Sequence, residues 1–265
     1  VISAIFREEQ HFFKWYGGWF RKQLRTIDHF FVQNEISAKL LTSIGIQHVT
    51  ISGDTRFDRV LSIAENPQQF PLIEKFTSAH KVLLAGSTWP PEEQMLPALP
   101  ERIPGLKIII APHEIGEDHL KSIEALFKDQ LTMRFSQADE KTIDKVSVLL
   151  IDGIGFLSSL YQYCDVALIG GGFGRGLHNI LEAVTFGKPV IFGPNFRKFI
   201  EAVELVNLGG GFVVHNQYEF IAQATDLLSN ETINNKASAI CGHYINKKSG
   251  ATEIILDTIK DVLPG

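Results

Sequence analysis

The chain has 265 residues, of which 45% are hydrophobic and 21% charged, and its formal net charge is −5. This acidic balance argues against nucleic acid as a partner, because proteins that bind nucleic acid usually present a basic face. The two cysteines, Cys164 and Cys241, lack metal-ligand spacing and are too few for a disulfide framework. No apolar run reaches the ~18 residues of a membrane-spanning helix.

The first fifty residues differ in character from the rest. Residues 11–26, "HFFKWYGGWFRKQLRT", contain six aromatic and four basic residues. Residues 30–54 read as a strand, a helix and a strand. Because fifty residues cannot bury a core of their own size, we expect residues 1–50 to be the tail of an α/β domain that the chain does not otherwise contain.

From residue 48 onward, short apolar runs alternate with helical patterns. The runs are "HVTISG", "KVLLAGS", "LKIIIAP", "SVLLID", "DVALIGGG" and "PVIFGP", and helices are expected at 92–99, 117–128, 155–163, 178–186 and 198–208. Such alternation predicts an α/β, Rossmann-like, doubly wound parallel sheet. We assign residues 51–247 to this nucleotide-binding domain and residues 248–265 to a C-terminal helix.

Several of the predicted strands end in unusual loops. In open parallel sheets, ligands bind at the carboxyl ends of the strands. Ser87 and Thr88 follow one strand, and their hydroxyls suit either a phosphate or an ordinary helix cap. His113 follows the next strand, and Ile154 with Gly155 follows a third, where a simple tight turn is the alternative.

The stretch "GGGFGRGLHNILEA", residues 170–183, is the strongest signal. A plain turn seldom needs so many glycines, whereas a backbone that approaches an anion does. Asn179 and Glu182 are three residues apart and so share one face of the expected helix. Glu182 can accept hydrogen bonds from ribose hydroxyls, as acidic residues do in nucleotide sites, although the pair could also serve only as a cap.

The same loops exclude two common nucleotide-binding classes. They lack the lysine of a Walker loop, and "GGGFGRG" lacks the spacing of a dinucleotide fingerprint near the first strand. This favours a nucleotide-sugar site over an NTPase or a dehydrogenase.

At this point the motifs resemble a known family, the 3-deoxy-D-manno-octulosonic acid (Kdo) transferases of lipopolysaccharide synthesis. The matching segments are "ISGDTRFD", "AGSTWPPEE", "MRFS", "LLIDGIGFLSSLYQYCDVALIGGG" and "GGGFGRGLHNILEAVTFGKPVIFGP". The resemblance implies the C-terminal half of a glycosyltransferase B type fold. It also implies inverting, metal-independent transfer of Kdo from CMP-Kdo to a lipid A precursor, without a cofactor, at the cytoplasmic face of the inner membrane.

Site residues follow from the matching positions. The resemblance implies that Asn179 and Glu182 hold the CMP part of the donor, together with the backbone at Gly171 and Gly172. It places Ser87 and Thr88 near phosphate and sugar, and Ile154 and Gly155 at the cytosine.

Three further positions differ from the family pattern or lie outside the main motifs. Arg56 stands where relatives commonly have a lysine, and we expect it to contact phosphate or sugar. His113 stands where many relatives have an arginine. We expect Arg175, in the glycine loop, to supply the charge that His113 lacks at neutral pH.

The resemblance places the catalytic base, a glutamate, in a first domain that this chain lacks, so the chain alone is expected to be inactive. Two alternatives stay open. One is another glycosyltransferase or a 2-epimerase that uses a UDP-sugar, and the other is a non-catalytic nucleotide-sugar binding module. We also expect the aromatic and basic residues 12–25 to rest on the inner-membrane surface, unless these aromatics pack against the absent domain.

Overall fold

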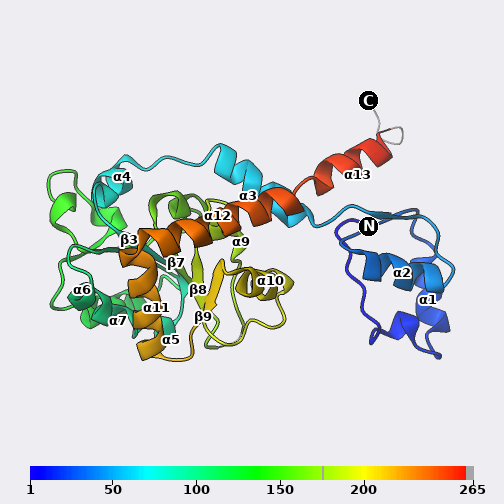
Figure 1. The fold of residues 1–265 in the computed structure, drawn as a ribbon, viewed down its shortest axis with the longest axis horizontal. Helices are drawn as coiled ribbons and strands as arrows, with labels where there is room; N and C mark the ends of the chain where they lie inside the picture. The colour runs from blue at the N-terminus through cyan, green and yellow to red at the C-terminus, as the bar shows by residue number, and fades with distance from the viewer. Residues whose placement is uncertain (175, 261–265) are drawn as a thin grey trace. The chain divides into compact units, whose positions relative to one another are not determined.

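The computed structural model describes residues 1–174 and 176–260, and it divides into two compact units. The first unit comprises residues 1–62 together with the chain from residue 246, and the second comprises residues 63–245. Figure 1 draws the start of the first unit in blue and the sheet of the second in cyan to yellow.

The first unit is built around two parallel strands. Its elements are η1 (His11–Phe13), α1 (Gly18–Leu24), β1 (Phe30–Val32), α2 (Glu35–Ser43), β2 (Val49–Ile51), α3 (Thr55–Glu65) and α13 (Ala251–Ile259). Phe30 pairs with Val49, and the apolar side of β1 packs on Leu41 of α2. The carboxylate of Asp58 accepts hydrogen bonds from the backbone amides of Gly250 at 2.6 Å and Thr252 at 2.7 Å, which caps the start of α13.

The second unit contains a seven-stranded, fully parallel sheet in the order β5-β6-β4-β3-β7-β8-β9. The strands are β3 (Val82–Thr88), β4 (Lys107–Pro112), β5 (Thr132–Arg134), β6 (Val148–Leu150), β7 (Val166–Ile169), β8 (Val190–Phe192) and β9 (Gly211–Val213). The central strands are buried on both faces, so successive residues such as Leu83 and Leu84 are both inaccessible to solvent. The predicted doubly wound α/β sheet is therefore confirmed.

Helices cover the sheet on both sides. They are α4 (Pro71–Thr77), α5 (Pro90–Glu93), α6 (Leu99–Arg102), α7 (Glu117–Leu126), α8 (Leu157–Leu160), α9 (Leu181–Val184), α10 (Ile200–Leu208), α11 (Gln217–Ser229) and α12 (Glu231–Lys248), with 3-10 turns at η2 (Leu96–Ala98), η3 (Phe135–Gln137), η4 (Ile143–Lys145) and η5 (Tyr161–Tyr163). Leu99, Ile123 and Phe220 pack on the face that carries Leu83. The thiols of Cys164 and Cys241 are buried in this unit. Their burial raises the pKa of each thiol to about 12.

The order of the strands reverses next to β3. The chain passes from β3 to β4 on one side and later crosses to β7 on the other side. The loops that follow β3 and β7 therefore diverge at the carboxyl edge of the sheet, which is where open α/β domains bind their ligands.

The structure differs from the sequence expectations at several elements. β5 and β9 were not anticipated, because each has only three residues and neither is an apolar run. β2 pairs with β1 rather than joining the large sheet. The helix expected at 178–186 is the shorter α9, because the side chain of Asn179 accepts a hydrogen bond from the amide of Leu181 at 3.2 Å and so precedes the helix. The division at residues 50 and 247 stays a prediction.

Candidate functional site

The glycine-rich loop packs against the backbone of its neighbours at the switch point. A Cβ atom on Gly170 would overlap the carbonyl oxygen of Ser87, and one on Gly172 would lie 2.5 Å from the amide nitrogen of Gly193. Gly171 has φ +86°, a conformation that other residues rarely adopt. The three consecutive glycines are thus needed to bring the ends of β3, β7 and β8 together, whatever the loop also binds.

The end of β3 is itself distorted. Its pairing with β4 shifts between Gly86 and Thr88, and Ser87 between them has φ +52°. A non-glycine residue in this left-handed region costs on the order of 1 kcal/mol or more, and such residues are concentrated at functional sites. Ser87 is half-buried, whereas Thr88 is inaccessible and its hydroxyl donates to Oε1 of Glu93 at 2.9 Å.

Two buried carboxylates follow β3 and hold the surrounding loops. Glu92 accepts hydrogen bonds from the amide of Trp89 at 3.1 Å and from the amide of Phe173, in the glycine-rich loop, at 3.3 Å. Burial raises the pKa of Glu92, although these backbone hydrogen bonds oppose the shift. Glu93 bonds through its second oxygen to Nε2 of His119 at 2.9 Å. The sequence suggested only a helix start at these glutamates, and the structure shows that they connect the loops.

Three aromatic rings meet above the carboxyl edge. Trp89 follows β3, His113 follows β4 and His178 ends the glycine-rich loop after β7. The Trp89 and His113 rings stack with centroids 4.7 Å apart, and the His113 and His178 rings stack at 4.5 Å. His113 was expected at the site, but Trp89 and His178 were missed, because only the strand order β4-β3-β7 shows that they meet.

Asn179 and Glu182 lie together as their spacing predicts. The amide Nδ2 of Asn179 donates to Oε1 of Glu182 at 3.0 Å. Asn179 is exposed and Glu182 half-buried. The phenol of Tyr161 is buried, and its pKa is raised chiefly by this burial. The negative charge of the nearby Glu182 carboxylate raises the pKa of Tyr161 further. Glu182 is thus a half-buried carboxylate in the vicinity of the buried Tyr161.

The remaining predicted site residues belong to other parts of the chain. Ile154 and Gly155 follow β6, where Ile154 is 81% exposed and Gly155 has φ +86°. Arg56 belongs to the first unit, where its guanidinium pairs with Asp54 at 2.8 Å. Arg175 lies outside the described residues. Among the described residues, no group of three or more His, Cys, Asp or Glu side chains could hold a metal ion.

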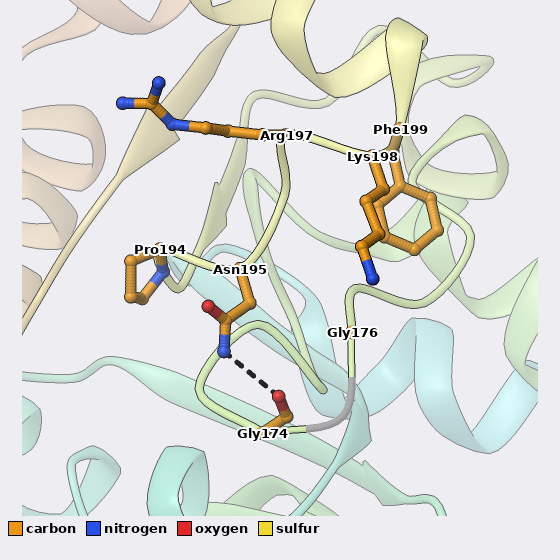
Figure 2. Close-up of a pocket in the computed structure, with 7 residues that line it drawn as sticks. All are labelled: Gly174, Gly176, Pro194, Asn195, Arg197, Lys198 and Phe199. Carbon is orange, nitrogen blue, oxygen red and sulfur yellow. Dashed lines mark hydrogen bonds between the residues drawn. The ribbon is translucent and has the colours of Figure 1, made fainter. Parts of the chain in front are cut away.

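A pocket of about 310 Å³ opens beside the glycine-rich loop, on the side of β8 (Figure 2). Its lining comes from that loop and from the segment that joins β8 to α10, namely Gly174, Gly176, Pro194, Asn195, Arg197, Lys198 and Phe199.

No helix in the described part of the chain is both long enough and apolar enough to cross a bilayer.

Comparison with known proteins places these features in context. No protein-family model matches the chain. It is 30% identical over 220 residues to a bifunctional glycosyltransferase/methyltransferase of Fusobacterium nucleatum, covering 80% of this chain and 34% of that protein. It is 29% identical over 199 residues to the Kdo transferase of Chlamydophila psittaci, covering 72% and 45% respectively. With the Kdo transferase of Aquifex aeolicus the identity is 31% over 147 residues, or 54% and 40%.

Solved structures share the fold. The C-terminal CMP-Kdo binding domain of WaaA from Acinetobacter baumannii matches with a TM-score of 0.58 and 18% identity, over 72% of this chain and 97% of that one. A UDP-GlcNAc 2-epimerase from Neisseria meningitidis, bound to UDP-GlcNAc, matches with a TM-score of 0.63 and 20% identity, over 98% and 68%. The chain spans less than half the length of the three relatives named above. The predicted resemblance to the C-terminal part of Kdo transferases is confirmed.

Proposed function

We propose that this chain, which resembles Kdo transferases in sequence, forms the donor-binding part of an enzyme that transfers Kdo from CMP-Kdo to a lipid A precursor. The observation that carries the proposal is the position of the glycine-rich loop. It leaves β7 at the switch point of the sheet and ends at the Asn179–Glu182 pair, where domains of this type bind nucleotides.

In this proposal each loop has a defined role. A carboxylate has several acceptor positions, so Glu182 can bond to Asn179 and also accept hydrogen bonds from ribose hydroxyls. The phosphate lies beside the glycine-rich loop and near the half-buried Ser87, whose backbone packs directly against Gly170 of that loop. The exposed Ile154 supplies an apolar surface for the cytosine. Arg56 and the ring of His113 contact the phosphate or the sugar.

The reaction is inverting and independent of metal ions. A base removes the proton of the acceptor hydroxyl, the hydroxyl oxygen attacks the anomeric carbon, and CMP leaves with the electrons of the broken bond. The resemblance assigns this base to a glutamate in the first domain of such enzymes, and we assign it to no carboxylate of this chain. The chain alone should bind CMP through the loops described above. It should show no measurable Kdo transfer, because loss of a base costs about 10²–10⁴-fold in rate.

Calorimetric titration with CMP tests the site. Glu182→Ala should weaken CMP binding at least about tenfold, because hydrogen bonds to a charged group are worth roughly 1.5–3 kcal/mol. Glu101→Ala, at an exposed position of α6, is the matched control and should bind as the wild type does. A CMP affinity of Glu182→Ala within twofold of the wild type would remove the assignment of the loop. Kdo transfer by the chain alone would show that the base lies within it.

A UDP-sugar enzyme remains the second candidate, because the same fold occurs in the 2-epimerase from Neisseria meningitidis. Fold alone does not distinguish the two nucleotides. Parallel titrations with CMP and UDP do so: the proposal requires CMP to bind the more tightly, and tighter binding of UDP would favour the epimerase class.

A further inference from the structure

The pocket beside the glycine-rich loop has fixed walls. The amide of Asn195 donates to the carbonyl oxygen of Gly172 at 2.9 Å, and its side-chain Nδ2 donates to that of Gly174 at 3.0 Å (Figure 2). A Cβ atom on Gly176 would lie 3.6 Å from the ring of Phe199, so this ring closes the opposite side. The segment after β8 is therefore tied to the loop after β7 independently of any ligand.

The charge of the pocket is positive. Its described lining contains Arg197 and Lys198 and no acidic residue. Both cations are exposed, and neither forms an ion pair or a hydrogen bond with another described residue. In Figure 2 the amine of Lys198 points toward the glycine-rich loop, whereas the side chain of Arg197 extends to the left of the view, away from that loop. Unpaired cations beside a preformed cavity suit an anionic ligand group.

The volume and position of the pocket limit what that group can be. Small-molecule sites span about 300–1,000 Å³, so a pocket of about 310 Å³ suits a single sugar rather than a whole nucleotide sugar. β8 is the direct neighbour of β7. A sugar in the pocket would thus lie next to a phosphate held by the glycine-rich loop.

We propose that this pocket binds the sugar of the donor and that Lys198, with Arg197 nearby, recognises the carboxylate of that sugar. The inference rests on the proposed function, because Kdo is a sugar acid whose carboxylate is attached to the anomeric carbon that also carries the phosphate. The two anionic groups of the donor then fit two neighbouring sites. UDP-N-acetylglucosamine has no such carboxylate, so these cations would select a sugar acid over a neutral sugar.

Charge removal at Lys198 tests the inference. Lys198→Met keeps most of the length of the side chain, and an exposed position tolerates the change. Binding of CMP-Kdo should weaken at least tenfold, whereas binding of CMP, which has no sugar carboxylate, should stay within twofold. Arg197→Met should also weaken the binding of CMP-Kdo, but by a smaller factor than Lys198→Met. Lys236→Met, at an exposed position of α12, removes the same charge elsewhere and should change neither affinity.

The outcomes separate this inference from the function on which it rests. If Lys198→Met weakened the binding of CMP and of CMP-Kdo equally, Lys198 would contact the phosphate, and its assignment to the sugar carboxylate would be overturned. Unchanged affinity for both ligands would also overturn it, while the donor-binding function stands. A wild-type chain that binds neither CMP nor CMP-Kdo would overturn both.

Discussion

The indole Nε1 of Trp89 donates a hydrogen bond to Nε2 of His178, with 3.1 Å between the nitrogen atoms. An indole nitrogen can only donate, so Nε2 is the acceptor, and a neutral His178 ring carries its proton on Nδ1. Protonation of Nε2 would break this bond. The contact joins the loops that follow β3 and β7, which flank the switch point of the sheet.

The first prediction concerns the pH dependence of stability. Burial and, secondarily, the neighbouring His113 lower the pKa of His178 below the ordinary value of 6.5. The unfolded chain then binds more protons at this residue, so its contribution to stability is present above pH ~6.5 and is lost as the pH falls toward the lowered pKa. His178→Gln keeps an acceptor for Trp89 but does not titrate. We expect the unfolding free energy of the wild type, relative to His178→Gln, to fall between pH 7.5 and pH 5.

His119 provides a control, because the pKa of this residue is shifted in the opposite direction to that of His178. Burial would lower its pKa, but the hydrogen bond and charge of Glu93 outweigh this effect and raise it. Its contribution is therefore complete below pH ~6.5 and is lost as the pH rises through the raised pKa. The wild type should lose stability relative to His119→Gln as the pH increases over the same range. Urea unfolding measures the free energy of unfolding at each pH. If this free energy depends on pH in the same way in both variants and in the wild type, the two histidines do not titrate as described.

The second prediction concerns the packing of the glycine-rich loop. Gly170→Ala places a Cβ atom against the carbonyl oxygen of Ser87, and neither backbone can move without disturbing the sheet edge. We expect a loss of about 1–3 kcal/mol, as for other overpacked sites. Gly242→Ala, in α12, meets nothing within 4 Å and should stabilise the chain by about 0.5–1 kcal/mol. Urea unfolding of both variants measures the contrast, and similar stabilities would disprove the close contact.

The third prediction concerns Glu92, which accepts hydrogen bonds at both carboxylate oxygens. Glu92→Gln has nearly the same shape, but its amide nitrogen would face a backbone N–H. Leaving one such buried donor unsatisfied costs about 1–3 kcal/mol. Glu101→Gln, at an exposed position, is the control and should stay within about 0.5 kcal/mol of the wild type. Full stability of Glu92→Gln would mean that the carboxylate does not hold the two loops.

Much of the sheet could be predicted from the sequence because its central strands are apolar on both faces, as in Lys107–Pro112. The spacing of Asn179 and Glu182 also predicted their contact. The Trp89–His113–His178 cluster could not be predicted, because only the order of the strands brings these positions together. The glycines indicated a close backbone approach, but the partner that the structure shows is Ser87, within the same chain.

The fourth prediction concerns Arg175, which we expect to supply the phosphate charge that His113 lacks. Arginine pairs with phosphate through two hydrogen bonds at neutral pH, whereas histidine is mostly uncharged there. Arg175→Ala should therefore weaken CMP binding more than twofold in calorimetric titration. Arg102→Ala, at an exposed position of α6, serves as the control for lost charge and should leave CMP affinity unchanged. An Arg175→Ala affinity within twofold of the wild type would refute the compensation.

The fifth prediction concerns membrane contact by residues 12–25. The structure divides the aromatics of this segment, because Phe12 and Phe13 pack against the small core of the first unit, whereas Trp15 is 92% and Trp19 65% exposed. Exposed tryptophans near Lys22 suit the interface of an anionic bilayer. Burying about half of an aromatic surface of roughly 150–250 Å² gives about 2 kcal/mol for each tryptophan, or more than tenfold in partitioning.

Replacing both tryptophans by serine should therefore lower binding to anionic vesicles at least tenfold in a flotation assay. Tyr218→Ser is the matched control, because Tyr218 is 85% exposed on α11 and lies outside the segment. Its binding should equal that of the wild type. Raising the salt concentration should weaken wild-type binding, because the attraction of basic side chains to anionic lipid is screened within about 10 Å at 0.1 M salt. Equal flotation of the double serine variant and the wild type would instead favour packing of Trp15 and Trp19 against another protein domain.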